Sequence, residues 1–448
     1  MYKKLAATGF PIVLTILFLG ASVVGYAGLA YYAHIDHPKQ LAIFLSLVFL
    51  GYGFWWFNRS LFSWRTLLIF AVLFRLIFMF DSHCRLSNDV FRYLWDAEQV
   101  SYGENPYDYT PAEWSMQRPN TIFDAEGKLY QNLEYKNAHS TYPPVNQYLW
   151  ANGAWLSRLM GYEDSIQARV FILKWIYLII EIITMLLLVK ILLKRSLAGQ
   201  LAGIYALNPL VIVEFSGNLH PEAIMILFLV IAAILALSER FILAAIPFGF
   251  AISTKFIPLL FLPFLVKKYG WKKTISFSVV ALLVVALLFL PFLSNQLITN
   301  VADSFYHFIE NVEFNASVYF IVKYFAVDSL QLIPLQDLGF FLLIATIIAI
   351  VILWWRYKKS TQAMLWIYVI YILLATSVQP WYLAITLVLA ILTNRRWPLV
   401  ASGAIMLSYF LYTFGLENKW ILITEYTIII SAMIFDYWYS KKHVENHA

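Results

Sequence analysis

Carboxylate and aromatic side chains gather most densely in "SNDVFRYLWDAEQVSYGENPYDYTP", residues 87–111, which follows a long apolar run. Ser87 or Asn88 can cap a helix that begins near Asp89, because short polar side chains accept hydrogen bonds from the free amides of a first turn. Spacings of three and four residues place four polar side chains on one face of this helix: Asp89, Arg92, Tyr93 and Asp96. On such a face the carboxylate can deprotonate a hydroxyl, and the guanidinium beside it can bind an anion. The alternative is an interfacial helix whose charges face water.

A second polar group lies in "GNLHPEA", residues 217–223, a short turn between two apolar segments. There His220 and Glu222 would lie at membrane depth, where ionisable side chains are costly and usually functional. A turn with merely solvated side chains is the alternative. Glu181 and Glu214 are instead expected to be paired inside the bundle, with a role as site acids as the alternative. No ligand spacing demands a metal ion, so we expect no metal and no cofactor, with a divalent metal left open.

Lys255 lies in "AISTKFIPLLFLP", residues 251–263, an apolar segment that prolines interrupt. We interpret residues 241–266 as two half-helices that enter the membrane and return, since broken backbone is tolerated where protein or a cavity surrounds it. A lysine at such a break needs a partner, and a phosphate is a natural one. The alternative is a side chain that extends to the membrane interface.

Amide and aromatic side chains open a late apolar segment, "SVQPWYLA", residues 377–384. Gln379, Trp381 and Tyr382 are therefore further site candidates. The alternative is the belt of aromatic side chains that membrane proteins carry at both interfaces.

The composition is that of an integral membrane protein. Of the 448 residues, 61% are hydrophobic and only 13% are charged, whereas soluble domains are about 25% charged. The one cysteine, Cys84, excludes an intramolecular disulfide and a cysteine-based zinc site. We expect membrane lipids as partners and no nucleic acid.

The expected fold is an all-α, polytopic transmembrane bundle of about twelve spans, with the broken pair at 241–266 and one large outer loop that carries interfacial helices. The spans are predicted at 9–33, 41–57, 61–80, 166–193, 197–216, 222–238, 274–294, 334–355, 362–376, 381–393, 398–415 and 420–438. The chain then divides into N-terminal spans (1–80), an extracytoplasmic loop (81–165) and a C-terminal bundle (166–448). Within the loop, the interrupted apolar stretch 142–161 is expected to lie in the interface.

Basic residues indicate the orientation. Most of the 32 lysines and arginines fall on one side of the predicted spans, and positive loops stay in the cytoplasm. A continuous span at 241–266 would move the basic cluster at 267–273 outside, which favours the broken pair. We therefore expect a multi-pass protein of the cell (inner) membrane, with both termini cytoplasmic and the loop 81–165 outside.

Five motifs in order resemble those of the GT-C superfamily of glycosyltransferases. They lie between residues 61 and 395 and read "SNDVFRYLWDAEQVSYGENPYDYTP", "TYPPVNQYLW", "NLHPEAIM", "STKFIPLLFLPF" and "QPWYL". The sequence resembles in particular bacterial polyprenyl-phosphate-mannose-dependent mannosyltransferases and the catalytic subunit of the first GPI mannosyltransferase. The second motif adds Tyr142 to the site candidates.

The resemblance implies roles for individual residues. Asp89 matches the essential acid of the first outer loop. Arg92 and Tyr93 match the Arg-Tyr pair that related enzymes use near the donor phosphate. Lys255 matches the basic residue after the broken helix. The acidic pair of that family is here a lone Asp89, with Asp81 eight residues earlier.

Among the aspartates, Asp89 is the expected base. It lies at the start of the helix, where the helix dipole should keep the pKa of its carboxyl low. Asp96 is better placed to orient Arg92, and Asp81 ends the preceding apolar segment and is expected to anchor it.

The implied activity is inverting transfer of a sugar, mannose by the resemblance, from a polyprenyl phosphate to a lipid, glycan or protein acceptor at the outer face. A phosphate leaves already ionised, so one carboxylate base is enough, whereas glycoside hydrolysis needs a carboxylate pair. The alternatives are a transporter or lipid-linked glycan flippase, and an O-antigen ligase or polymerase. The sequence shows no internal repeat, which disfavours a transporter. The long outer loop is early in the chain, whereas O-antigen ligases carry theirs late.

Overall fold

The computed structural model describes residues 10–80, 83–117, 127–162, 165–358, 360–415 and 418–445, and every element named among them is a helix. Two compact units are each assembled from separate stretches of chain. The first contains Met1–Leu86, Lys174–Leu219 and Arg395–Ala448, and the second contains Ser87–Leu173 and His220–Asn394. The all-α expectation is therefore confirmed for the described residues.

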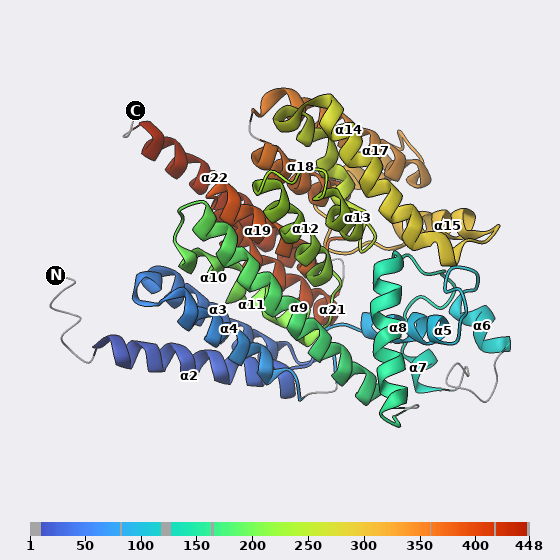
Figure 1. The fold of residues 1–448 in the computed structure, drawn as a ribbon, viewed down its shortest axis with the longest axis horizontal. Helices are drawn as coiled ribbons and strands as arrows, with labels where there is room; N and C mark the ends of the chain where they lie inside the picture. The colour runs from blue at the N-terminus through green and yellow to red at the C-terminus, as the bar shows by residue number, and fades with distance from the viewer. Residues whose placement is uncertain are drawn as a thin grey trace. The chain divides into compact units, whose positions relative to one another are not determined.

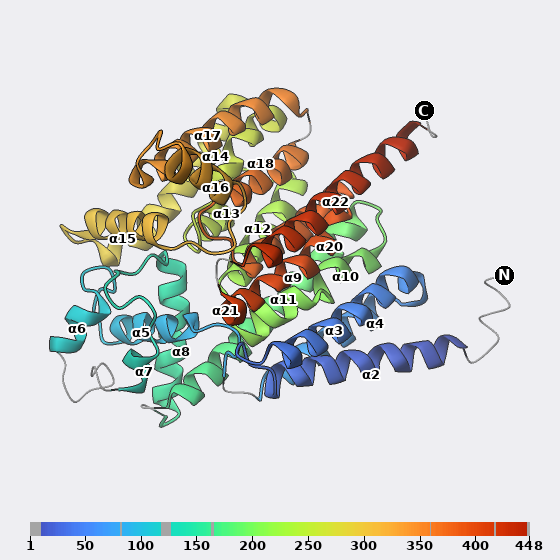
Figure 2. The same ribbon diagram turned by 180° about the vertical axis from the view of Figure 1, so that it is seen from behind.

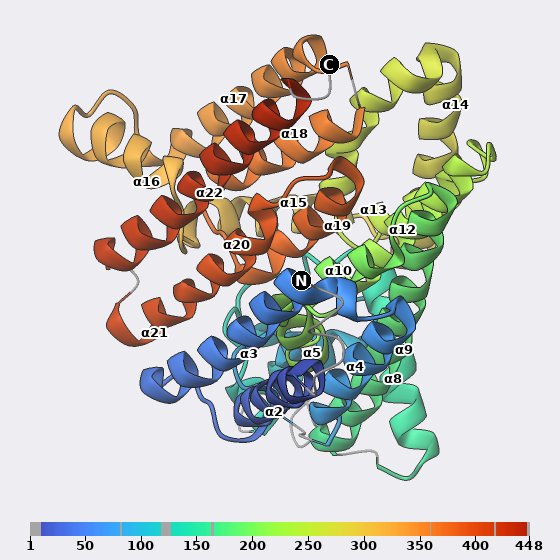
Figure 3. The same cartoon turned by 90° about the vertical axis from the view of Figure 1, so that its left-hand side faces the viewer.

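The first unit is built on long apolar helices. In chain order it contains α2 (Phe10–Tyr31), α3 (Pro38–Asn58), η1 (Arg59–Leu61), α4 (Trp64–Ile77), α9 (Ile166–Lys194) from Lys174 onward, η2 (Gly199–Ala202), α10 (Gly203–Ala206), α11 (Pro209–Ile212), the π-helix η3 (Val213–Gly217), α20 (Trp397–Ala404), η8 (Ile405–Phe410), α21 (Leu411–Phe414) and α22 (Lys419–Glu445). Helices α2, α3 and α4, drawn in blue, lie side by side (Figure 1). The C-terminal helices α20 and α22 also pack on each other (Figure 3).

Buried polar pairs occur within this first unit. The Arg75 guanidinium lies 2.8 Å from the Glu181 carboxylate, and both side chains are fully buried. Tyr205 donates a further hydrogen bond of 2.6 Å to Glu181. Glu214 accepts from Tyr409 at 2.7 Å and from Asn218 at 3.0 Å. Glu181 and Glu214 are thus paired inside the unit, as expected.

The second unit contains the helices that carry most of the predicted site. These are α5 (Asp89–Ser101), α6 (Pro111–Gln117), α7 (Lys128–Gln131), α8 (Pro144–Leu159), α12 (Glu222–Leu237), α13 (Ala245–Ile252), η4 (Ile257–Phe261), α14 (Leu262–Phe289), η5 (Leu290–Phe292), α15 (Leu297–Asn311), α16 (Val318–Val322), the π-helix η6 (Lys323–Ser329), α17 (Leu335–Arg356), α18 (Ser360–Leu374), η7 (Pro380–Leu383) and α19 (Ala384–Thr393). Helix α5 packs on α8, while α13 packs between α12 and α14 (Figure 2).

Seven described helices are long and apolar enough to cross a membrane. They are Val13–Tyr31, Pro38–Leu61, Ile166–Lys194, Ile257–Phe292, Asp337–Arg356, Trp397–Phe414 and Lys419–Lys442. An eighth is possible if Pro209–Gly217 and Glu222–Leu237, which meet at an angle of 115°, form one span. The five other predicted spans are also helical, but each is short or broken. The expected count of about twelve spans is therefore not confirmed.

The helix break around Lys255 is present. Helix α13 ends at Ile252 and η4 begins at Ile257, so Lys255 lies in the gap between them. A further interruption occurs at Gly270, where φ is 77° and ψ is 165°, a conformation that favours glycine. The structure contains no membrane, so the return of this pair through the bilayer stays a prediction. The same holds for the interfacial position of 142–161, now seen as helix α8, and for the three-part division of the chain.

Helix α15 was not expected from the sequence. It lies between two predicted spans and belongs to a stretch that is bonded to the loop after α5. Asn105 donates a hydrogen bond of 3.0 Å to the Phe292 carbonyl, and Asn300 of α15 donates one of 2.8 Å to the Tyr107 carbonyl. The large predicted loop is therefore held by a second segment within the same unit.

Candidate active site

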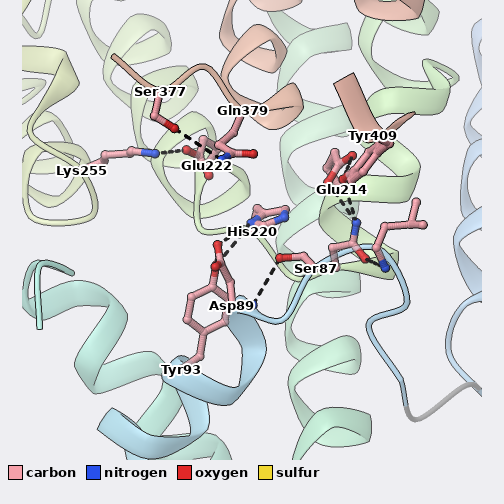
Figure 4. Close-up of polar contacts among 12 residues, drawn as sticks. Ser87, Asp89, Tyr93, Glu214, His220, Glu222, Lys255, Ser377, Gln379 and Tyr409 are labelled. Atoms are coloured by element: carbon pink, nitrogen blue, oxygen red, sulfur yellow. Dashed lines mark hydrogen bonds and ion pairs between the residues drawn. The ribbon is translucent and has the colours of Figure 1, made fainter. Parts of the chain in front are cut away.

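The start of α5 positions Asp89. The Ser87 Oγ accepts a hydrogen bond of 3.3 Å from the Asp89 backbone amide, whereas the Asn88 side chain makes no cap and instead donates to Glu134 at 3.4 Å. Asn88 therefore occupies the N-cap position without a side-chain cap, and Ser87 bonds the first amide of the helix instead. Figure 4 shows Asp89 facing His220, with Tyr93 one turn further along α5.

Both contacts of the Asp89 carboxylate fall on one oxygen. The Tyr93 hydroxyl donates to Oδ2 at 3.4 Å, and the His220 Nδ1 lies 3.7 Å from the same atom. Tyr93 and His220 are themselves 3.2 Å apart through the hydroxyl and Nδ1. No described residue forms a hydrogen bond to Oδ1, and the Asp89 side chain is 29% exposed. One oxygen is thus fixed and the other is open to a ligand.

The surroundings raise the pKa of Asp89 above its ordinary value. Desolvation by the neighbouring side chains is the main cause, and it outweighs the lowering effect of His220 and Lys255, while Glu222 adds to the rise. The helix dipole was expected to keep this pKa low, and that expectation is wrong. The removal of water around the carboxylate has a larger effect than the N-terminus of α5. A higher pKa makes Asp89 a stronger proton acceptor.

Lys255 is paired with Glu222. The ammonium forms a short ion pair with Glu222 Oε1 and lies 4.1 Å from the centroid of the Tyr382 ring. Glu222 is the first residue of α12 and its side chain is 1% exposed, while that of Lys255 is 25% exposed. Neither interpretation of Lys255 from the sequence had included this partner. The ion pair neutralises a carboxylate that would otherwise be buried alone.

The N-terminus of α8 holds the break that carries Lys255. The Val145 amide donates to the Ser253 carbonyl at 3.0 Å, and the buried Asn146 side chain donates to the Thr254 carbonyl at 2.7 Å. These bonds satisfy backbone groups that a broken helix leaves without partners. No local pattern in the sequence predicts these bonds, because 108 residues separate Asn146 from Thr254.

Tyr93, which bonds Asp89, belongs to a cluster of three aromatic rings. Tyr93 stacks on Trp150 of α8 with centroids 4.3 Å apart, and Tyr142 meets both rings edge-on at 5.2 and 5.1 Å. Tyr142 was a site candidate from its motif, whereas Trp150 was not. Aromatic pairs in these geometries fix ring positions and exclude water.

The late motif joins the same cluster. Trp381 stacks face to face on the His220 ring at 3.4 Å, and Tyr368 fixes η7 by donating a 2.6 Å hydrogen bond to the Tyr382 carbonyl. The Gln379 amide makes a long contact of 3.5 Å with the Ser377 hydroxyl (Figure 4). Trp381 and Tyr382 therefore pack on site residues of the same unit.

Arg92 and Asp96 form a separate group. Arg92 Nε lies 2.8 Å from Asp96 Oδ1, and Arg92 Nη1 donates to the Ala138 carbonyl at 2.8 Å. Asp96 is fully buried and also accepts a short hydrogen bond from Ser140 and one of 3.1 Å from Gln147. Asp96 thus orients Arg92, as expected, but the guanidinium points to Ala138 and not to Asp89. The charges do not simply face water, because Asp96 is fully buried.

Two expectations remain open at this site. Asp81 lies outside the described residues. Within the described ranges no group of three or more histidine, cysteine, aspartate or glutamate side chains is arranged to hold a metal ion, and the expectation of no metal or cofactor stays a prediction.

A comparison with protein families identifies the chain. The family model described as "Alpha-(1->6)-mannopyranosyltransferase, N-terminal domain" matches residues 18–269, more than half of the sequence. The chain belongs to this family. The matched range includes Asp89, His220, Glu222 and Lys255 but ends before η7. No curated protein matches the chain. Family membership and the apolar helices support a membrane mannosyltransferase in general, and they favour an enzyme over a transporter.

In this mannosyltransferase, Trp381→Ala should expose His220, because the indole covers one face of an imidazole that is otherwise fully buried. Carbethoxylation of His220, followed by peptide mass spectrometry, should become at least about tenfold faster than in the parent protein, while Trp381→Phe should stay close to it. His34, whose side chain is 48% exposed, should react equally in all three and provides the control. Equal His220 rates in the parent and Trp381→Ala would contradict the stacking.

Proposed function

We propose that this protein transfers mannose from a polyprenyl-phosphate donor to an acceptor at the outer face of the membrane, as a GT-C type enzyme with inversion at the anomeric carbon. The acceptor is a lipid, a glycan or a protein. Family membership supports the sugar, and the cluster around Asp89 supports the reaction type.

The open Oδ1 of Asp89 is the observation that carries this proposal. Tyr93 and His220 fix Oδ2 and so orient the carboxylate, and the raised pKa makes it a better proton acceptor. The other carboxylate of this cluster, Glu222, is buried and paired with Lys255. One positioned base is sufficient where the leaving group needs no proton.

Lys255 can serve the leaving group. An ammonium has three donor hydrogens, and the bond to Glu222 uses one of them. The side chain is 25% exposed, so the remaining donors can reach a phosphate. A positive charge beside a departing phosphate stabilises the charge that develops in the transition state.

The reaction balances in one step. Asp89 Oδ1 takes the proton of the acceptor hydroxyl as its oxygen attacks the anomeric carbon. The bond from that carbon to the phosphate oxygen breaks on the opposite face, and its electron pair leaves with the polyprenyl phosphate. Attack opposite to the leaving group inverts the configuration at the anomeric carbon.

Asp89→Asn keeps the size of the side chain and removes the base, so turnover should fall by about 10²–10⁴-fold. Transfer of labelled mannose from the lipid donor measures this, with donor binding and thermal stability checked in parallel. Glu134→Gln removes another carboxylate, whose own pKa the Asp89 charge helps to raise. Its turnover should stay within about threefold of the parent, because Glu134 is not oriented by Tyr93 and His220. Near-normal turnover of Asp89→Asn would overturn the assignment.

The pH profile gives a second measure of the same assignment. A base works only when deprotonated, so turnover should fall as the pH drops through the pKa of Asp89. Because burial raises this pKa, the acidic limb should lie above the value of about 4 that is ordinary for aspartate. Asp89→Asn should lose this limb from its residual activity. A limb at the ordinary value would show that the carboxylate is not desolvated.

Lys255→Met should raise the apparent KM for the lipid donor more than it lowers kcat if Lys255 binds the donor phosphate. Lys255→Arg keeps a positive charge and serves as the matched control, with a smaller change in KM. Steady-state transfer at varied donor concentration separates the two constants. An unchanged KM in Lys255→Met would indicate that the lysine serves only to neutralise Glu222.

The proposed location is the cell (inner) membrane, with both termini in the cytoplasm and residues 81–165 outside. Cys84 is the one cysteine of the chain and is partly exposed, so it reports on this loop directly. A membrane-impermeant maleimide should label it in intact spheroplasts, with detergent-solubilised protein as the accessibility control. Labelling only after permeabilisation would reverse the topology.

A further inference from the structure

The Glu222 carboxylate has one oxygen without a partner. Oε1 is bound by Lys255, but Oε2 is buried and forms no hydrogen bond with any described residue. Only 1% of the side chain is exposed. A buried acceptor in this state has lost its hydrogen bonds to water and has no protein donor to replace them. This is unfavourable unless a ligand supplies a donor.

The neighbours of Glu222 are suited to a polar, hydroxylated ligand. Gln379 precedes Trp381 and Tyr382 in the segment that packs on this site, and its amide can both donate to and accept from a hydroxyl. The Tyr382 ring contacts the same Lys255 ammonium that binds Glu222. A carboxylate and an aromatic ring that both contact one ammonium are a set that can orient a sugar ring.

Lys255 relates this group to the donor. If its ammonium binds the donor phosphate, as proposed above, the sugar is attached to that phosphate through its anomeric carbon. The same ammonium is paired with Glu222, so a sugar attached to the bound phosphate would lie close to the Glu222 carboxylate. The charges of both residues act on the pKa of Asp89, and the proposed reaction therefore has the attacked carbon between the base and this group.

We propose that Glu222 Oε2 accepts a hydrogen bond from a ring hydroxyl of the transferred hexose, and that this contact selects the sugar. The inference rests on the proposed function and names what that site recognises. A site built to bind a hydroxyl rejects an analogue that lacks it, because its own polar group is then left unpaired.

The experiment compares polyprenyl-phosphate mannose with its 2-, 3-, 4- and 6-deoxy forms as donors. In the parent enzyme one deoxy donor should lose about 10-fold to 100-fold in kcat/KM relative to mannose. Glu222→Leu, which has no acceptor, should reduce this loss to less than about threefold. Glu222→Gln keeps a neutral acceptor, should show an intermediate loss, and provides a reading if Glu222→Leu does not fold.

Ratios within one variant isolate the contact. Any general damage from the loss of the partner of Lys255 acts on all donors alike and cancels in the ratio. Glu134→Gln is the control and should keep the pattern of the parent. If no deoxy donor changes its relative rate in the Glu222 variants, a water or no ligand satisfies Oε2, and the inference is overturned while the transferase stands. If the parent enzyme transfers no mannose from the lipid, the proposed function itself is overturned.

Discussion

The pairing of Lys255 with Glu222 is the constraint on which the site depends. A carboxylate with 1% of its side chain exposed must be matched by a positive charge, and Lys255 provides it from outside α12. Lys255 lies in the gap between Ile252 and Ile257, so the break in the helix positions the ammonium that pairs with Glu222. The same charge offsets part of the rise that burial causes in the pKa of Asp89, which couples the proposed base to the proposed phosphate site.

Helix α8 connects the two sides of this arrangement. Its first turn holds the carbonyls of Ser253 and Thr254, while Trp150 on the same helix stacks on Tyr93 beside the base. One rigid helix therefore sets both the position of the break and the orientation of Asp89. A shift of α8 would move the base and the cation together, which preserves their spacing better than two independent supports would.

Local features of the site were predictable and long-range ones were not. The helix beginning at Asp89 and the break at Lys255 follow from polar caps and prolines in the adjacent sequence. The raised pKa of Asp89, the partner of Lys255 and the direction of Arg92 depend on residues brought together from distant segments. All of the predicted apolar segments are helical. Hydropathy does not register the turns and prolines that shorten several of them. About twelve spans were therefore expected, whereas seven or eight described helices are long enough to cross a membrane.

The position of η7 in the chain has a consequence for synthesis. Trp381 completes the stack on His220 from a segment that is made long after Asp89, Glu222 and Lys255 have left the ribosome. A nascent or truncated chain that ends with the matched family range, at residue 269, would hold the base and the ion pair but not the ring that covers the histidine. The proposed site is therefore complete only after η7 has been made, and a shorter chain would lack the ring that covers His220.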